Sequence, residues 1–114
     1  MITKVDIDAF KVYNQTPLEM VRDFASAMGH PLDDKYDQNT KLKKLRRTLI
    51  EEEYNELWDA DLPVDILKEM ADLVYVIFGQ AASFGWDLDE ALRRVHESNM
   101  SKLDNQGKPF KRPD

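Results

Sequence analysis

Residues 40–84 read TKLKKLRRTLIEEEYNELWDADLPVDILKEMADLVYVIFGQAASF, and this stretch decides the fold. Apolar residues recur at helical spacing on both sides of the break Asp61-Leu62-Pro63. The pattern predicts one helix from residue 39 or 40 to about residue 60, and a second from about 64 to 84. Because the connection is short, the two helices are expected to pack antiparallel. The centre of the chain is therefore predicted to be a helical hairpin.

A further helix is predicted on each side of the hairpin. Thr16 provides an N-cap hydroxyl and Pro17 the first helical residue of a helix that runs to about residue 28, where Gly29 ends it. After Gly85, Asp87 opens a last helix that runs to about residue 102. The remaining ends, residues 1–15 and 104–114, are expected to be an irregular arm and an irregular tail. The chain is thus predicted to be one all-α domain, residues 1–114, folded as a helical bundle.

Acidic residues occupy positions where the hairpin calls for apolar ones. The first hairpin helix has a leucine stripe at Leu42, Leu45 and Leu49. At about 100° per residue, the same stripe continues through positions 52, 53 and 56. Those positions hold Glu52, Glu53 and Glu56. The stripe that should face the protein interior therefore changes from apolar to carboxylate.

The second hairpin helix carries a related anomaly. Residues 70–78 are apolar around nearly the whole helix, which predicts that this segment is buried. Glu69 and Asp72 interrupt it, and their spacing of three places them on one face. In an antiparallel hairpin the two acidic patches can face each other.

Carboxylates gathered at a helix interface repel each other and lose hydration, so they need either raised pKa values or a bound cation. Oxygen ligands without Cys or His suit Mg²⁺ or Mn²⁺, and Mg²⁺ held in this way takes substrate phosphates. A solvated acidic face is the usual explanation of a glutamate run, but the stripe position argues against it. A di-iron carboxylate site needs the motif Glu-x-x-His on two helices. The residues three before His30 and His96 are Ala27 and Arg93, so the sequence excludes such a site.

The two acidic motifs resemble those of a known superfamily. Glu52-Glu53-Tyr54-Asn55-Glu56 followed by Glu69-Met70-Ala71-Asp72 is similar to the EExxE…ExxD signature of the all-α NTP pyrophosphatases. These include MazG-like proteins, dimeric dUTPases and phosphoribosyl-ATP pyrophosphohydrolases. The resemblance covers about residues 16–112, including Asn99 and Lys102, and points to the MazG-like branch with dUTPase-type members. Ala25 departs from the pattern, because these relatives carry His there, and the preferred base stays open.

The resemblance implies a MazG-like fold of four or five helices, assembled as a homodimer or a dimer of dimers (a homotetramer). It implies Mg²⁺-dependent cleavage of a nucleoside triphosphate, such as dUTP, dCTP, dGTP or a broad set, to the monophosphate and pyrophosphate, for nucleotide-pool sanitation or control. Mn²⁺ is expected to substitute for Mg²⁺. The implied metal ligands are Glu53, Glu56, Glu69 and Asp72. Glu52 would be a further ligand or would orient the attacking water, so Glu52 and Glu53 are the predicted catalytic pair.

Four other residues are candidates for substrate contact. Asn99 and Lys102 would meet the substrate by the resemblance, Lys102 at a phosphate, although Lys at a helix end is also a common cap. Arg46 lies near the acidic stripe and could pair with a carboxylate or a phosphate. Phe24 could stack on a base or belong to the core.

Composition excludes several classes of protein. The 114 residues carry 22 acidic and 16 basic side chains, a formal net charge of −6, which argues against non-specific nucleic-acid binding. The absence of cysteine excludes disulfides, thiol nucleophiles and Cys-ligated zinc. No signal peptide or bilayer-spanning run is recognised, so a cytoplasmic protein without membrane contact is expected.

Two hypotheses follow from the sequence. The first is the metal-dependent pyrophosphohydrolase. The alternative is a non-catalytic helical module that binds a cation or a partner. In either case, self-association is expected, because one chain cannot cover all sides of residues 70–78 and because Trp58 projects away from the leucine stripe.

Overall fold

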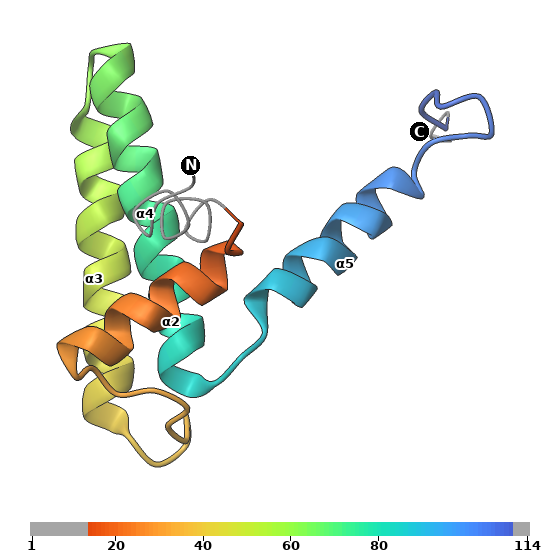
Figure 1. The fold of residues 1–114 in the computed structure, drawn as a ribbon. Helices are drawn as coiled ribbons and strands as arrows, with labels where there is room; N and C mark the ends of the chain where they lie inside the picture. The colour runs from red at the N-terminus through yellow and green to blue at the C-terminus, as the bar shows by residue number, and fades with distance from the viewer. Residues whose placement is uncertain (1–13, 111–114) are drawn as a thin grey trace, which may run out of the picture.

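The computed structural model describes residues 14–110, and within them it contains four helices and no strand (Figure 1). The helices are α2 (Pro17–Met28), α3 (Thr40–Asp59), α4 (Pro63–Phe84) and α5 (Leu88–Met100). The all-α prediction is confirmed. Most of the predicted arm, residues 1–13, and the last four residues of the predicted tail lie outside the described residues.

The helices begin and end where the local sequence specifies it. Thr16 Oγ1 accepts a hydrogen bond from the Glu19 amide at 3.2 Å and so caps α2. Asp87 accepts from the Glu90 amide in the same way and caps α5. Gly29 and Gly85 end α2 and α4 in the left-handed conformation, at φ 72° and 69°. The last helix ends at Met100, two residues earlier than predicted.

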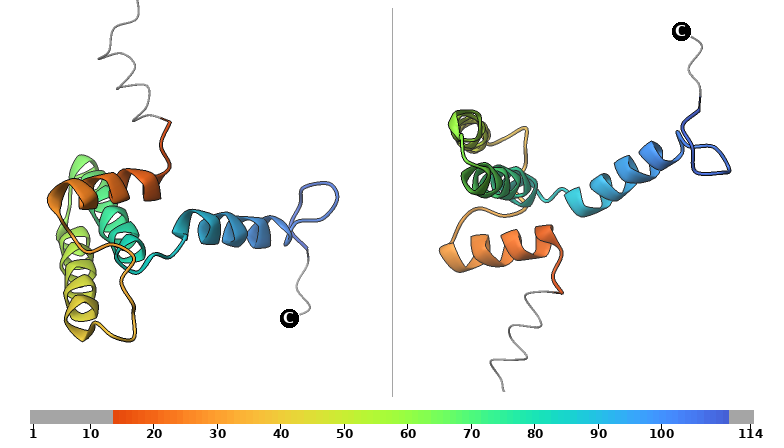
Figure 2. Two further views of the ribbon diagram at one scale, coloured as in Figure 1. Left: turned by 60° about the horizontal axis from the view of Figure 1, so that its bottom comes forward. Right: turned by 90° about the horizontal axis from the view of Figure 1, so that it is seen from above.

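The core is small and lies where α2 crosses the lower half of the α3–α4 hairpin (Figures 1 and 2). Val21 on α2 packs with Phe78 and Ala82 on α4, and three half-buried apolar residues, Leu18, Leu32 and Leu88, surround them. The loop between α2 and α3 is fastened to the end of α4, because the amides of Asp33 and Asp34 donate to the carbonyls of Ala82 and Ser83. These contacts fix the position of α2 against the hairpin.

Residues 70–78 of α4 are only partly buried in the single chain, as expected for a segment that one chain cannot cover on all sides, and their burial by a second copy stays a prediction. Met70, Val74 and Tyr75 are 50%, 49% and 41% exposed, whereas Phe78 is buried. The leucine stripe of α3 is also covered only in part, because Leu42 is buried but Leu45 is 52% exposed. The physical reason is that α2 and α3 cover two sides of α4 while the fourth helix does not fold back onto it.

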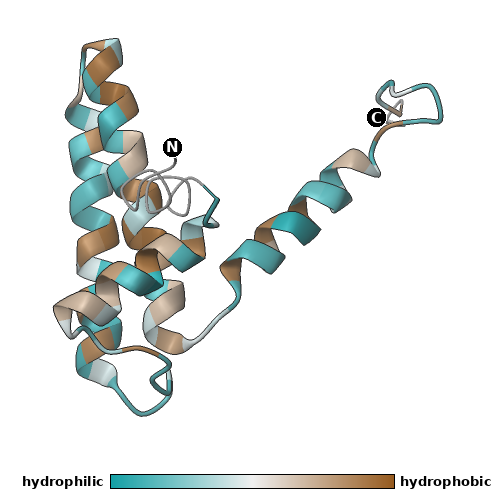
Figure 3. Cartoon of the chain, in the orientation of Figure 1, coloured by the Kyte–Doolittle hydropathy of each residue, from teal (hydrophilic) through white to brown (hydrophobic). Residues whose placement is uncertain are grey.

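That fourth helix, α5, projects away from the other three (Figures 1 and 2). None of its residues is buried. It is anchored at its start, where Leu88 packs on the core and the Asp89 carboxylate accepts from the Leu18 amide at 3.2 Å. Hydrophobic residues nevertheless occur at intervals along this helix, between hydrophilic ones (Figure 3). The chain that follows α5 is more ordered than the irregular tail predicted, because Leu103 pairs with Pro109 around a turn at Gly107.

Candidate metal centre

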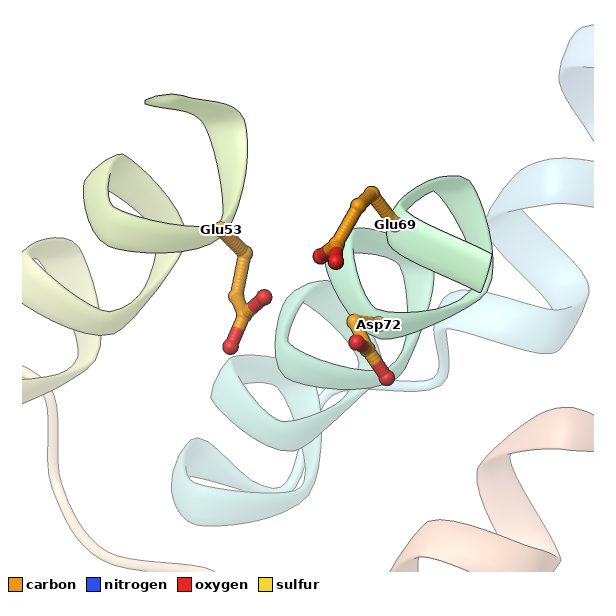
Figure 4. A group of neighbouring side chains, drawn as sticks. All are labelled: Glu53, Glu69 and Asp72. Carbon is orange, nitrogen blue, oxygen red and sulfur yellow. The ribbon is translucent and has the colours of Figure 1, made fainter. Parts of the chain in front are cut away.

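Three carboxylates meet between α3 and α4. Glu53 extends from α3 towards Glu69 and Asp72 on α4 (Figure 4). One oxygen from each residue lies within 4.8 Å of the other two. The structure therefore brings together the two acidic motifs that the sequence predicted to face each other.

The helical hairpin explains why these three side chains converge. Glu69 and Asp72 are three residues apart on α4 and share a face. Glu53 is four residues after Leu49, and both are half-buried on the side of α3 that packs against α4. A different register of the hairpin would separate Glu53 from the α4 pair, so the turn at residues 60–62 helps to position the cluster.

The cluster lacks internal compensation for its negative charge. Glu53 Oε2 and Glu69 Oε2 are buried, and neither atom has a hydrogen-bond partner among the described residues. Burial raises the pKa of Glu53, and the neighbouring carboxylates of Glu56, Asp72 and Glu69 raise it further. Lys68 supplies part of the missing charge, since its Nζ lies 3.0 Å from Asp72 Oδ2 and 3.4 Å from Glu69 Oε1.

These residues fit a hard divalent cation. All the converging donors are carboxylate oxygens, which Mg²⁺ and Mn²⁺ prefer. Two buried oxygens without partners are the kind of atoms that a cation would satisfy. Lys68 would not prevent this, because its side chain is 66% exposed and the Lys side chain is flexible. Glu53, Glu69 and Asp72 could thus hold a metal ion.

Comparison with known proteins decides the family. The sequence pattern of the phosphoribosyl-ATP pyrophosphohydrolase family matches residues 21–99. This range includes the whole hairpin and all three clustered carboxylates. The chain belongs to the phosphoribosyl-ATP pyrophosphohydrolase family. This family is part of the all-α NTP pyrophosphatase superfamily that the acidic motifs resemble, so the recognition made from sequence is confirmed.

One viral relative extends the match. An uncharacterized protein of Acanthamoeba polyphaga mimivirus, L479, is 31% identical over 102 residues. The alignment covers 82% of this chain but only 38% of the viral protein. Membership of the phosphoribosyl-ATP pyrophosphohydrolase family indicates the coarse class of activity, a pyrophosphohydrolase acting on acid anhydrides.

Two of the predicted ligands lie outside the group of three. Glu52 and Glu56 are exposed on α3. Glu56 is close enough to raise the pKa of Glu53 through repulsion and a shared hydrogen bond. By helical spacing Glu56 and Glu52 lie about 60° and about 100° from Glu53, on the same side of α3, and α4 covers only the part of the helix around Glu53. The pyrophosphohydrolase signature is therefore divided between an inner carboxylate, Glu53, and two outer ones.

Arg46 and Phe24 border a cavity whose lining includes none of the clustered carboxylates but reaches Leu49, one turn before Glu53. This cavity, of about 170 Å³, lies between α2 and the hairpin. Arg46 Nη2 donates to the Val76 carbonyl at 3.2 Å, and it makes no ion pair with any carboxylate of residues 14–110. Phe24 is 47% exposed and makes edge contacts with His30 and Tyr75, each at 5.9 Å between ring centres.

Asn99 and Lys102 are not near the carboxylates of the same chain. Lys102 Nζ donates to Asn99 Oδ1 at 3.0 Å. Both residues lie at the far end of α5, which points away from the hairpin (Figure 1). The family match ends at Asn99, so Lys102 lies just beyond it. Within one chain, these two predicted substrate contacts and the metal-binding group are separate.

Lys68 is the site residue that sequence reasoning missed. The signal was present, because Lys68 precedes Asp72 by four residues, a spacing that favours an ion pair on a helix. Burial of the hydroxyl raises the pKa of Tyr75, and its place beside Phe24 was also not predicted, since it depends on how α2 crosses the hairpin.

Proposed function

We propose that this chain hydrolyses nucleoside triphosphates between the α and β phosphates, releasing the monophosphate and pyrophosphate. The observation that carries the proposal is the group formed by Glu53, Glu69 and Asp72, with two buried oxygens that have no hydrogen-bond partner within residues 14–110. Membership of a pyrophosphohydrolase family supports the same reaction class. Nucleotide-pool sanitation or control is the role that such a reaction would serve.

Each carboxylate has a role in this proposal. Glu53, Glu69 and Asp72 would hold Mg²⁺ or Mn²⁺, with Glu56 as an outer ligand. A bound cation would neutralise the triphosphate and make a water more nucleophilic. Glu52, exposed beside Glu53, would be a further ligand of the cation or would orient that water. Lys68 would move from Asp72 and Glu69 to the incoming phosphates, because its exposed ammonium can exchange one oxyanion for another.

Products measured over a nucleotide panel test the proposal. We expect at least one ribo- or deoxyribonucleoside triphosphate to yield its monophosphate and pyrophosphate when Mg²⁺ or Mn²⁺ is present. Phosphoribosyl-ATP belongs in the panel because the matched family carries its name. Orthophosphate and nucleoside diphosphate as the only products would refute cleavage at the α–β bond. Cation binding without turnover of any substrate would favour the non-catalytic module.

Metal binding is expected to stabilise the fold, because a cation that binds only the folded chain shifts the unfolding equilibrium. At a Mg²⁺ or Mn²⁺ concentration about 100 times the dissociation constant, the gain is ~2.7 kcal/mol. The melting temperature of the wild type should therefore rise by several degrees when the cation is added. A Glu69→Gln variant should lose most of the increase, and an equal increase in both proteins would place the cation elsewhere.

We also propose that the working unit is a homodimer, or a dimer of dimers, in which α5 packs against a second copy. Leu88, Leu92 and Val95 lie on one face of α5, and the latter two are 55% and 56% exposed. Asn99 continues the same face by helical spacing, and Lys102, two residues past the end of α5, is joined to it by the hydrogen bond between their side chains. If this face of α5 packs against a second copy of the chain, Asn99 and Lys102 would lie beside that copy.

The outer face of α4 offers a matching surface. Leu67, Met70 and Val74 line an apolar cavity of about 340 Å³ beside α2. The α4 residues that line this cavity run from Leu67 to Phe78. They span ~18 Å of helix, close to the ~20 Å length of α5. The partner's α5 would thus complete a four-helix bundle and place Asn99 and Lys102 where the substrate binds.

A further inference from the structure

The cavity between α2 and the hairpin has an arginine in a lining that is otherwise mostly apolar and aromatic, with Ser83 as a further polar residue. Phe24 and His30 border it from the α2 side, and Tyr75 borders it from α4. Among the described residues that line it, Arg46 is the only one of the types Arg, Lys, Asp and Glu. The cavity therefore combines flat aromatic walls with one permanently charged donor group, the guanidinium, beside the neutral hydroxyls of Tyr75 and Ser83.

The Arg46 guanidinium is held in place but not neutralised. Its Nη2 donates to the Val76 carbonyl at 3.2 Å, while its Nε is buried and has no acceptor among the described residues. Burial alone lowers the pKa of Arg46, because no neighbouring carboxylate offsets the loss of hydration. A half-buried guanidinium with an unused donor is costly unless a ligand supplies acceptors.

Gly79 makes this arrangement possible. A Cβ at residue 79 would lie 1.8 Å from Arg46 Nη2, so any other side chain would displace the guanidinium. Gly is unfavourable in the middle of a helix by roughly 1 kcal/mol relative to Ala. The absence of a side chain at Gly79 therefore makes room for the Arg46 guanidinium in the cavity wall.

The position of Arg46 relative to the carboxylates indicates which part of a nucleotide it would meet. Arg46 precedes Glu53 by seven residues on α3, and Gly79 follows Asp72 by seven on α4. Two helical turns correspond to ~10 Å along the hairpin. With the phosphates at the carboxylates, the cavity lies at the other end of the nucleotide, beside the base. Phe24 and Tyr75 supply aromatic surfaces of the kind on which bases stack.

We propose, on the basis of the proposed function, that Arg46 is a specificity-determining residue that selects nucleotides whose base presents a keto edge. A guanidinium can only donate, so it suits the O6 and N7 acceptors of guanine or the O4 acceptor of uracil and thymine. The exocyclic amino groups of adenine and cytosine are donors and oppose it. Arg46 thereby separates keto-bearing bases from amino-bearing ones.

The test compares kcat/KM for GTP with ATP, and for UTP with CTP, in four proteins. The wild type is expected to prefer the keto base of each pair by about tenfold or more. Arg46→Met should bring each ratio close to one, by lowering kcat/KM for the keto base of each pair more than for the amino base. Gly79→Ala, which leaves Arg46 in the chain but displaces its guanidinium, should lower the ratios without harming the helix. Arg47→Met is the matched control, because Arg47 is the exposed neighbour outside this cavity, and it should leave the ratios unchanged.

Calorimetric binding of GMP and AMP provides a readout that does not need turnover. The wild type should bind GMP more tightly, and Arg46→Met should remove the difference. An equal loss for all bases in Arg46→Met would show that Arg46 contacts phosphate and would overturn the proposal, as would a wild type without base preference. If the base preference is seen in binding but no nucleotide is hydrolysed, the proposed function fails and the assignment of Arg46 stands. If nucleotides are neither bound nor hydrolysed, both fail.

Discussion

Glu53→Gln should lower kcat/KM by more than about 100-fold, because changes to groups that only support a metal ligand already cost 10–100-fold. Glu53 is the α3 residue whose carboxylate reaches the pair on α4 (Figure 4). Glutamine keeps the size of the side chain but removes the charge that would hold the cation. Asp72→Asn should have a similar effect from the opposite helix. Steady-state kinetics with the preferred nucleotide and saturating Mg²⁺ measure both variants.

The same substitution should not weaken the fold. In the absence of metal, the neighbouring carboxylates and burial disfavour the charged form of Glu53 and raise its pKa. Removing that charge relieves repulsion, so the melting temperature of Glu53→Gln without metal should equal or exceed that of the wild type. Glu51→Gln is the matched control, since Glu51 is exposed two residues away and lies outside the cluster. Near-normal turnover in Glu53→Gln, or equal losses in both variants, would show that the ligand assignment is wrong.

Leu92→Asp combined with Val95→Asp should convert a dimer into a monomer and abolish activity with it. These side chains are the exposed apolar residues at the middle of the α5 face proposed to meet a second copy. Charges there would have to be buried without partners at the interface, which is strongly unfavourable. Light scattering after size exclusion at low micromolar concentration should change from about twice the chain mass of 13.3 kDa, or a multiple of it, to a single chain.

Met100→Asp is the control for this double variant. Met100 is also apolar and 52% exposed, but helical spacing places it away from the face of Leu92 and Val95. It should retain both the assembly and the activity. A well-folded, active wild-type monomer would refute the homodimer, and an unchanged assembly in the double variant would exclude this face of α5.

Mixing Glu53→Gln with Lys102→Met tests whether each active site needs a residue from the partner subunit, which is a separate question from whether the chain forms a dimer. If Lys102 contacts the substrate bound at the carboxylates of the partner subunit, Glu53→Gln and Lys102→Met should complement each other, because a mixed dimer contains one intact site. Random exchange of subunits would restore about a quarter of the wild-type activity. No recovery from exchanged subunits would mean that Lys102 does not act across the interface.

The local features of this fold could be predicted from sequence because each depends on a few adjacent residues. Thr16 and Asp87 cap their helices as expected, and Gly29 and Gly85 end theirs. The convergence of Glu53 with Glu69 and Asp72 was also predictable, since helical periodicity and a short turn fix the register of a hairpin. These inferences needed no knowledge of how distant segments pack.

The missed features depend on long-range packing. The direction of α5 is set after Gly85 by a short connection whose residues do not specify an angle, so the sequence predicted a packed fourth helix where one chain leaves it projecting. The exposure of Glu52 follows from how narrowly α4 covers α3. The contact of Arg46 with Gly79 joins residues 33 apart in sequence, and no periodic pattern indicates it.

The fate of each phosphorus atom tests the central claim most directly. Phosphorus NMR can follow the best nucleotide of the panel during incubation with the wild type and Mg²⁺, then after chelation with EDTA, and again after Mg²⁺ is restored. The account predicts that the α signal becomes that of the monophosphate while the β and γ signals merge into that of pyrophosphate. It also predicts that the conversion stops with EDTA and resumes with Mg²⁺. Release of orthophosphate, or turnover that continues unchanged in EDTA, would contradict a metal-dependent pyrophosphohydrolase centred on Glu53, Glu69 and Asp72.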